Sequence, residues 1–307
     1  MKIYFFWPFK DKIPTSDTVE SYEFYNGLKN TENVTLVNSF QEADYIFFMM
    51  DLYNCYNLKH YNNVLDVNDI NNFKNHTEHQ KDIIIDYNDW TNTSNNILDN
   101  KLNLVAKYFK RSMVDKKLFK LIDYSREIIP ISYGIRSDFI NYDKEYDFKY
   151  YNYDICCLFN RNDHGGIRAL LYDIVIKYKG NKFVGRVNAP NCYGSVNKKY
   201  FNILKTSKII ITANPPNWEG DFRLWEALLM GNLVLCDRMI IPHIIKHPLV
   251  NKKHLVFYDK PSDILDLINY YIKNEAERNQ IGKEGREYSL KHHKFSNRVK
   301  EVVNSLK

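Results

Sequence analysis

The stretch Asn217-Trp-Glu-Gly-Asp-Phe-Arg-Leu-Trp-Glu-Ala-Leu-Leu-Met-Gly-Asn-Leu-Val-Leu-Cys-Asp237 carries the clearest fold signal in the chain. Its polar, glycine-containing start is followed by good helix formers at residues 222–230, and Gly231 is a typical helix C-terminus. Residues 233–236 predict a short buried strand, and residues 208–212 predict another strand before the loop. The order strand, loop, helix, strand is the building block of a parallel α/β sheet.

The loop and the first helical turns of this stretch are unusually charged. They carry four ionisable side chains: Glu219, Asp221, Arg223 and Glu226. A buried crossover helix has little use for such charges, and ligands of parallel sheets bind at the carboxyl ends of the strands. We therefore expect a polar ligand at this loop.

The pattern Arg223-x-x-Glu226-Ala-x-x-x-Gly231 before an apolar strand resembles the donor-binding segment of GT-B glycosyltransferases. The resemblance is to the CgeB-like (spore-maturation type) branch of the glycosyltransferase group 1 superfamily. Residues 200–211 resemble the helix and strand that precede this segment there, and weaker motifs continue to residue 298. The resemblance covers residues 150–307. For the whole chain, it implies two Rossmann-like domains that face each other across a cleft. It also implies a nucleotide-sugar donor bound by the second domain.

Two interpretations of Arg223 and Glu226 stay open, because residues three apart share one helix face. They can form an exposed ion pair of little energetic weight. Alternatively, Glu226 accepts hydrogen bonds from the ribose hydroxyls, and Arg223 neutralises the departing diphosphate. Retaining GT-B enzymes often have two glutamates separated by seven residues, whereas six separate Glu219 from Glu226. Asp221 is therefore the alternative to Glu219 as the first acid.

The loop of residues 160–168 predicts a second part of the donor site. It contains Arg161, Gly165, Gly166 and Arg168, and it ends at a predicted helix N-terminus, where free N–H groups favour an anion. Glycine allows the backbone to approach a ligand closely, and an arginine can bind a diphosphate through two hydrogen bonds. The alternative is an exposed turn in which Arg168 forms a surface ion pair.

A general base for the acceptor is expected in the N-terminal half. Asp11 and Asp86 are the candidates in our prediction, and Asp51 and Asp89 also follow predicted strands. The segments 66–69 and 86–89 are spaced one residue too far for an Asp-x-Asp metal motif. We therefore expect neither a divalent metal nor another cofactor, since the nucleotide sugar is a substrate. A pair of histidines at 292 and 293 is expected to face solvent.

Composition limits the other classes of protein. The chain has 307 residues, 44% hydrophobic and 15% aromatic, which is typical of a globular protein long enough for two domains. The net charge of +6 forms no continuous basic stripe, so no nucleic-acid partner is expected. Five scattered cysteines lack a C-x-x-C pair, and Cys156 and Cys236 are expected in the core. We found neither a signal peptide nor a transmembrane run and expect a cytoplasmic protein.

Three segments organise the chain in our prediction. Residues 1–145 form a Rossmann-like acceptor domain, residues 146–286 a Rossmann-like nucleotide-sugar domain, and residues 287–307 a helix that crosses back to the first domain. Residues 141–152 are predicted to be the interdomain linker, and residues 40–44 a short helix. Further strands are predicted at residues 2–7, 34–37, 45–50, 82–86, 104–108, 128–131 and 153–159.

The sequence thus favours a metal-independent glycosyltransferase with a nucleotide-sugar donor and a glycan, protein or small-molecule acceptor. One alternative is a catalytically silent GT-B scaffold that binds a glycan or a protein partner. A fucosyltransferase- or exostosin-like transferase is another, although the fucosyltransferase pattern expects Glu-Lys near residues 221–223 and Pro-Val after Gly231. An unrelated two-domain α/β enzyme, such as a nucleotide-sugar epimerase, is the third.

Overall fold

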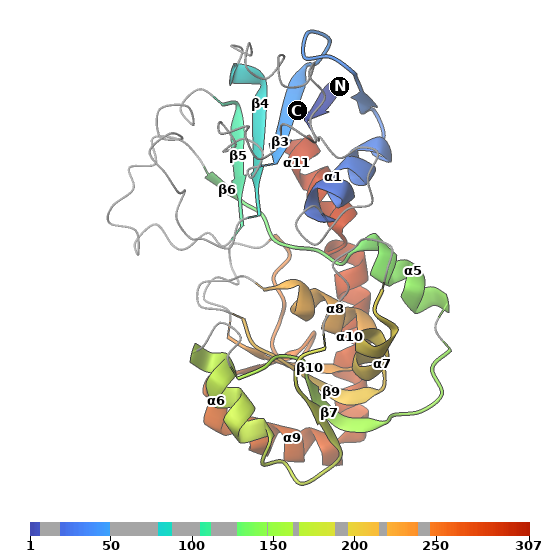
Figure 1. Ribbon diagram of the computed structural model, residues 1–307, viewed down its shortest axis with the longest axis vertical. Coiled ribbons are helices and arrows are strands. Elements are labelled where there is room, and N and C mark those ends of the chain that lie inside the picture. The colour runs from blue at the N-terminus through green and yellow to red at the C-terminus, as the bar shows by residue number, and fades with distance from the viewer. Residues whose placement is uncertain are drawn as a thin grey trace. The chain divides into compact units, whose positions relative to one another are not determined.

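The structure is a computed structural model in which the chain forms two compact units. The first unit is Met1–Ser132 with Arg298–Lys307, and the second is Tyr133–Asn297. Each contains one parallel sheet (Figure 1), which confirms the predicted α/β fold with two parallel sheets. The structure describes residues 1–6, 19–49, 79–87, 105–111, 128–145, 147–161, 166–187, 196–214, 220–238 and 246–307.

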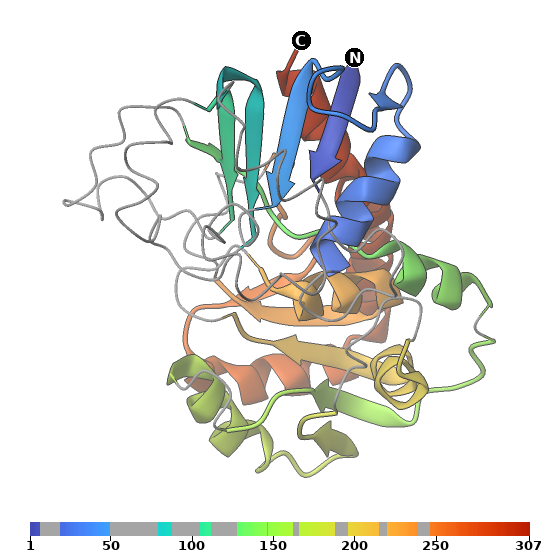
Figure 2. The ribbon, with the colours of Figure 1, turned by 45° about the horizontal axis from the view of Figure 1, so that its top comes forward.

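The first unit is built on a six-stranded sheet with the order β2-β1-β3-β4-β5-β6, in which every recorded pairing is parallel. Strands β1 and β3 are almost continuously apolar, as expected when both faces are covered. Helix α1 lies beside this sheet (Figure 2). The elements are β1 (Lys2–Phe6), α1 (Val19–Lys29), β2 (Thr35–Leu36), β3 (Tyr45–Met49), a 3₁₀ turn (His79–Lys81), β4 (Asp82–Asp86), β5 (Lys107–Lys110) and β6 (Ile128–Pro130).

Two sequence predictions in the first unit need correction. The strand expected at residues 104–108 begins at Lys107 and ends at Lys110. Its second residue, Tyr108, is in register with Ile84 of β4. The helix expected at residues 40–44 is a turn. Five residues are too few to offset the cost of helix nucleation, and Phe40 instead packs edge-on against the ring of Tyr4, with centroids 4.6 Å apart.

The end of the chain belongs to the first unit. Helix α11 (Phe295–Ser305) contributes Val299 and Val302 to its buried residues. The hydroxyl of Tyr45 in β3 donates to the carbonyl of Leu306 at 3.2 Å. Our prediction set the domain boundaries at 145/146 and 286/287, whereas the two compact units meet at 132/133 and 297/298.

The second unit is built on a five-stranded parallel sheet with the order β11-β10-β9-β7-β8. Alternate residues of its central strands face opposite sides of the sheet. On β9, Ile209 and Ile211 belong to the core cluster that includes residues of α6 and α9. Helix α7 contacts β7 and β9, and helix α8 contacts β9 and β10. The strands are β7 (Tyr153–Cys157), β8 (Lys182–Val184), β9 (Ser207–Thr212), β10 (Leu233–Asp237) and β11 (Val256–Tyr258). The helices are α5 (Ser137–Glu145), α6 (Gly166–Val175), α7 (Lys198–Lys205), α8 (Phe222–Met230), α9 (Ile264–Lys273) and α10 (Glu275–His292), with a 3₁₀ turn at Pro261–Asp263.

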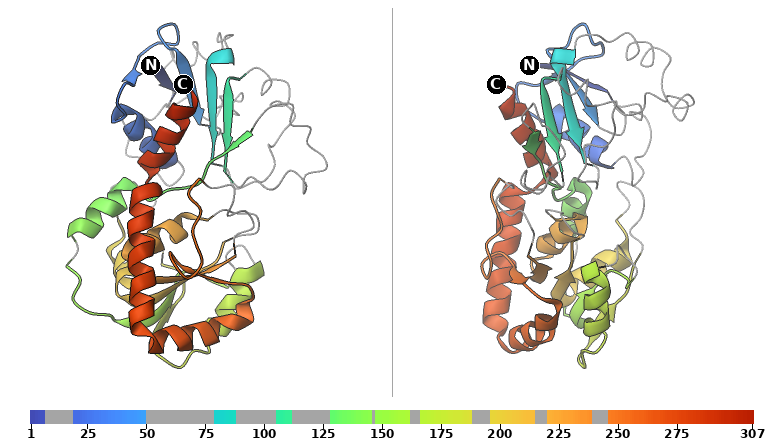
Figure 3. Two further views of the ribbon diagram at one scale, coloured as in Figure 1. Left: turned by 180° about the vertical axis from the view of Figure 1, so that it is seen from behind. Right: turned by 90° about the vertical axis from the view of Figure 1, so that its left-hand side faces the viewer.

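Helix α10 packs against α8 and β10 (Figure 3). At its end lies His293, which we expected to face solvent. Its side chain is instead buried and stacks on Trp225 of α8, with ring centroids 4.5 Å apart. His293 is the C-cap of α10, and its backbone N–H donates to Ser289. The cap geometry therefore turns this ring toward α8, which the polar sequence of α10 did not reveal.

The predicted linker at residues 141–152 is only partly a connection. Residues 141–145 form the end of α5, which is held in the second unit by a buried carboxylate. Asp143 accepts a hydrogen bond from Lys205 Nζ at 2.7 Å and another from Arg286. Residues 141–145 thus lack apolar periodicity because ion pairs, rather than apolar packing, fix this end of α5.

Within the described part of the chain, no helix is both long enough and apolar enough to cross a membrane. The cysteines expected in the core are there: Cys156 and Cys236 are fully buried, and both are free thiols.

Candidate functional site

The N-terminus of α8 is the centre of the candidate site. Asp221 is its N-cap and has extended backbone angles, and its Oδ1 accepts a hydrogen bond from Leu224 N at 3.1 Å. Such a cap satisfies one of the free N–H groups at a helix start. At the other end, Gly231 adopts a left-handed conformation with φ 79°, which favours glycine. The helix predicted at residues 222–230 is confirmed at both ends.

Asp221 also binds two arginines through its second oxygen. Arg168 Nη2 lies 2.7 Å from Oδ2, and Arg223 Nη1 lies 3.1 Å from the same atom. Because one carboxylate is shared by two guanidinium groups, these three side chains carry one excess positive charge. The charge lies at the N-terminus of α8, where the helix dipole also favours an anion.

The exposed-turn interpretation of Arg168 is wrong, whereas its contact with a diphosphate stays a prediction. Its side chain is only 1% exposed, so its ion pair with Asp221 is not a surface pair. Its Nε donates to the carbonyl of Ala213 at 2.8 Å, just after β9. The guanidinium of Arg168 therefore ties the start of α6 to the end of β9 and to the cap of α8.

Arg223 is the more accessible of the two arginines, with 31% of its side chain exposed. Burial opposes the charge of Arg223, but the interactions with Asp221, Tyr200 and Glu226 together outweigh it and raise the pKa of the guanidinium. Arg223 thus stays cationic while part of its side chain remains open to a ligand.

Glu226 lies one turn further along α8 and is only 5% exposed. Its Oε2 accepts a hydrogen bond from the hydroxyl of Tyr200 at 2.6 Å. Burial raises the pKa of Glu226 to about 7, although the hydrogen bond from Tyr200 and the charges of Arg136 and Arg223 act in the opposite direction. The alternative of an exposed Arg223–Glu226 ion pair is wrong, because Arg223 pairs with Asp221 and Glu226 is buried.

Two residues of this site were not proposed from the sequence. Tyr200 was noted only as part of a motif resemblance, and Arg136 gave no signal. Arg136 lies just before α5, with its Nε 3.0 Å from Asp138 Oδ1, and its charge favours the ionised form of Glu226. Arg136 lies 90 positions before Glu226, and no local pattern connects them. Only the fold brings the two side chains together.

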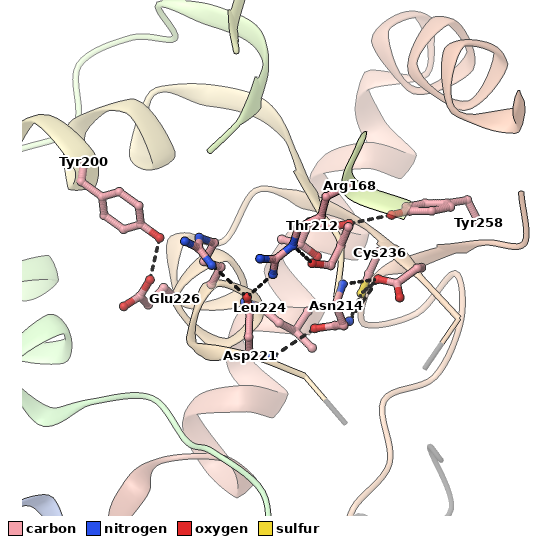
Figure 4. A network of polar contacts seen from close by, with 12 residues as sticks. Arg168, Tyr200, Thr212, Asn214, Asp221, Leu224, Glu226, Cys236 and Tyr258 are labelled. Atoms are coloured by element: carbon pink, nitrogen blue, oxygen red, sulfur yellow. Dashed lines mark hydrogen bonds and ion pairs between the residues drawn. The ribbon is translucent and has the colours of Figure 1, made fainter. Parts of the chain in front are cut away.

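A second polar network joins the strand ends to the same helix (Figure 4). The backbone N–H of Asp221 donates to Asn214 Oδ1 at 3.0 Å, and Asn214 Nδ2 donates to Asp237 Oδ1 at 3.1 Å. Burial raises the pKa of Asp237 to about 6, against the hydrogen bonds that Asp237 accepts. The carboxyl ends of β9 and β10 are thus linked to the cap of α8.

Other predicted site residues lie elsewhere or outside the described residues. Arg161 is an exposed side chain whose Nε lies 2.9 Å from Asp173. Gly166 begins α6 with φ +56°, a conformation that glycine adopts without strain. Outside the described residues lie Asp11, Asp51, Asp89, Gly165 and Glu219.

Asp86, the other candidate base, ends β4 in the first unit. It is 2% exposed and lies 3.2 Å from Lys110 Nζ, which is equally buried. The hydroxyl of Tyr108 also donates to Asp86. Lys110 and Tyr108 both lie on β5, the strand next to β4, and the role of Asp86 as a general base stays a prediction.

The described residues include no cluster of three or more histidine, cysteine, aspartate or glutamate side chains placed to hold a metal ion. The polar groups around α8 are arginines, a tyrosine and carboxylates with protein partners. Their chemistry suits an anionic ligand with hydroxyl groups, since guanidinium binds phosphate oxygens and a carboxylate accepts from hydroxyls.

Comparison with known proteins found a family model that matches the part of the chain around this site. Residues 169–304 match the family model described as glycosyl transferase-like. The matched range includes all of α8. A search of curated protein sequences found no significant match.

Solved structures resemble the whole chain. An alpha-glucosyltransferase in complex with UDP and a 13-mer DNA containing an HMU base is 10% identical, with a TM-score of 0.56, covering 99% of this chain and 98% of the other. HepE of Anabaena in complex with UDP-glucose is 11% identical, with a TM-score of 0.54 and coverage of 100% and 99%. Sucrose-phosphate synthase from Thermosynechococcus elongatus is 8% identical, with a TM-score of 0.53 and coverage of 94% and 76%.

At such low identity these matches show the fold, which is that of GT-B glycosyltransferases. The family match covers the part of the chain that carries the α8 site. The GT-B fold and the glycosyl transferase-like match over residues 169–304 together support a nucleotide-sugar-dependent glycosyltransferase.

Proposed function

We propose that the protein transfers a sugar from a nucleotide-sugar donor to an acceptor hydroxyl, without a divalent metal, and that the donor binds at the N-terminus of α8. The observation that carries the proposal is the pairing of two features on one helix. Arg223 supplies a partly exposed positive charge, and Glu226 is a buried carboxylate with a hydrogen bond but no recorded ion pair. A diphosphate and a ribose present the complementary groups.

In this proposal each residue has a separate role. Arg223 and the start of α8 bind the diphosphate, Glu226 accepts hydrogen bonds from ribose hydroxyls, and Arg168 positions Asp221 and thereby Arg223. The positive charge is in place before the reaction, so it stabilises the negative charge that develops on the leaving diphosphate. Arg161, Gly165 and Gly166 stay proposed contacts of the donor.

The transfer itself breaks the bond between the sugar's anomeric carbon and the diphosphate oxygen, which leaves with the electron pair. A bond forms between that carbon and the acceptor oxygen, whose proton passes to a base or to the departing diphosphate. We leave the base unassigned between Asp11, which lies outside the described residues, and Asp86, which ends β4.

The finer assignments are proposals as well. The motifs around Tyr200, Arg223 and Glu226 favour the CgeB-like branch, and the basic character of the α8 site favours metal independence. We propose a glycan, protein or small molecule as acceptor rather than a nucleic acid, and we keep the expectation of a cytoplasmic protein. UDP-sugars are the first donors to test, because the similar structures include complexes with UDP-glucose and UDP.

The test is a thermal-shift screen over UDP-, GDP- and CMP-sugars, followed by detection of the released nucleotide, which is UDP, GDP or CMP. We expect one nucleotide class to raise the melting temperature and to be turned over with or without an added acceptor. A donor that binds without turnover across an acceptor screen would indicate the silent scaffold instead. A protein that binds no nucleotide sugar contradicts the proposed function.

A further inference from the structure

Tyr200 is held so that its hydroxyl has a defined direction. It lies in the first turn of α7, where Asn197 caps its backbone N–H at 3.1 Å. The side chain is buried, and its ring lies edge-on to Phe139, with centroids 6.4 Å apart. The hydroxyl then meets Glu226 Oε2 at 2.6 Å (Figure 4). Helix α7 thus presents one fixed donor to the carboxylate on α8.

This hydrogen bond divides the two oxygens of Glu226 between two tasks. A phenol donates a single proton, and here it goes to Oε2. Among the described residues, none donates a hydrogen bond to Oε1, which therefore keeps its lone pairs for another donor. A ribose carries neighbouring hydroxyl groups that can fill this place. The structure therefore separates an oxygen that is held from an oxygen that can bind.

The same hydrogen bond affects the charge of Glu226. Burial raises the pKa of Glu226 to about 7, and the bond from Tyr200 is the largest influence that lowers it. Arg136, just before α5, and Arg223, on α8, also lower it, while Asp221 at the cap of α8 raises it. Loss of the Tyr200 hydroxyl would leave a buried carboxylate with less support for its negative charge.

We propose that Tyr200 is a positioning residue of the donor site, which orients Glu226 and favours the charged form that accepts hydrogen bonds from the donor's ribose. The inference rests on the proposed function and adds a property to it. Donor affinity rises with pH as Glu226 ionises, and the hydroxyl of Tyr200 sets the pH at which this rise occurs.

The experiment measures the dissociation constant of UDP-glucose by calorimetry between about pH 5.5 and 8.5. UDP-glucose suits this range because its two phosphates have no terminal proton that titrates near neutrality. In the wild-type protein we expect affinity to rise roughly tenfold or more across the range, with a midpoint near pH 7. Tyr200→Phe is expected to weaken binding and to move the midpoint upward by about one pH unit or more.

Two further variants separate a role in binding from a role in folding. Glu226→Gln cannot ionise, so its affinity is expected to be low and independent of pH. Tyr258→Phe removes a comparable buried hydroxyl, which donates to the carbonyl of Thr212 at 2.8 Å. Tyr258→Phe is expected to lower stability as Tyr200→Phe does. Its pH midpoint for UDP-glucose affinity is expected to equal that of the wild type.

The outcomes distinguish this inference from the proposed function. A wild-type protein that binds UDP-glucose with the same affinity at every pH overturns the inference and leaves the function standing. An unchanged midpoint in Tyr200→Phe also overturns the inference. If Tyr200→Phe does not fold, a midpoint near pH 7 that persists in Glu226→Gln overturns it instead. If the wild type binds no nucleotide sugar, the proposed function fails and the ribose role of Tyr200 fails with it.

Discussion

Asp86 in the first unit and Glu226 in the second are both buried acids that accept a hydrogen bond from a tyrosine hydroxyl. They differ in their cations. Lys110 Nζ lies 3.2 Å from Asp86, whereas Glu226 has no ion pair with any residue that the structure describes. A buried charge is costly unless it is paired, and the pKa of Glu226 rises accordingly to about 7.

This difference separates a carboxylate that the fold completes from one that a ligand completes. Asp86 has a cation within its own sheet, because Lys110 lies on the neighbouring strand in register with it. The charges that act on Glu226 come from Arg136 and Arg223, and Arg223 is already paired with Asp221. We therefore expect substitutions at Asp86 to affect folding and substitutions at Glu226 to affect binding.

The largest expected effect comes from breaking the pair in the first unit. Lys110→Met removes a buried cation that lies 3.2 Å from Asp86, and we expect it to cost roughly 3–5 kcal/mol of unfolding free energy. Urea unfolding followed by circular dichroism would measure this. Lys149→Met is the control, because Lys149 is 71% exposed in its pair with Asp147 and should lose almost nothing. A loss below about 1 kcal/mol in Lys110→Met would show that Asp86 does not depend on its cation.

The second prediction concerns the pH dependence of stability. The folded chain holds the proton of Glu226 up to about pH 7, whereas the unfolded chain releases it near 4.5. Glu226 therefore contributes stability below pH 4.5 that is lost as pH rises to about 7. Relative to Glu226→Gln, the wild type should lose roughly 3 kcal/mol over this interval.

Denaturant unfolding of the wild type and Glu226→Gln at both ends of the interval gives this difference, since other titrating groups cancel. Glu287→Gln makes the same chemical change at a side chain that is 65% exposed, and it should show no such difference. Equal pH profiles for the wild type and Glu226→Gln would mean that Glu226 ionises as readily in the folded chain as in the unfolded chain.

The third prediction sharpens the binding side of the comparison. Glu226→Gln should weaken donor binding by roughly 1.5–3 kcal/mol, the range for a hydrogen bond to a charged group. This corresponds to a roughly tenfold to hundredfold loss of affinity. Glu219→Gln, in the same segment of sequence, should change affinity less. Titration of both variants with the nucleoside diphosphate identified in the screen decides, and equal affinities would remove Glu226 from the ribose site.

The smallest expected effect is that of chelation. If arginine charge rather than a metal balances the diphosphate, EDTA should leave the affinity of the wild type for its nucleotide sugar unchanged. The same titration with and without added Mg²⁺ or Mn²⁺ provides the check. A large loss of affinity on chelation would show that the positive charge at α8 does not suffice.

Residues 217–237 were predictable because several local signals agree there. Helix formers, a helix-ending glycine and a buried strand all depend on neighbours in sequence, and the structure has α8 and β10 where these signals place them. Residues 40–44 and His293 were predicted wrongly for the opposite reason. Their conformations depend on packing against Tyr4 and Trp225, which are distant in sequence.

The sequence by itself determined the two parallel α/β sheets and the polar character of the α8 segment, since periodicity, capping and turn chemistry act over a few residues. It also supplied Arg223 and Glu226 as candidates. Only the tertiary structure decided which charges meet: Arg168 with Asp221, Tyr200 with Glu226, and Arg136 close enough to favour the charge of Glu226. Burial and pairing depend on long-range contacts, and they decide whether a carboxylate is neutralised by the fold or left for a ligand.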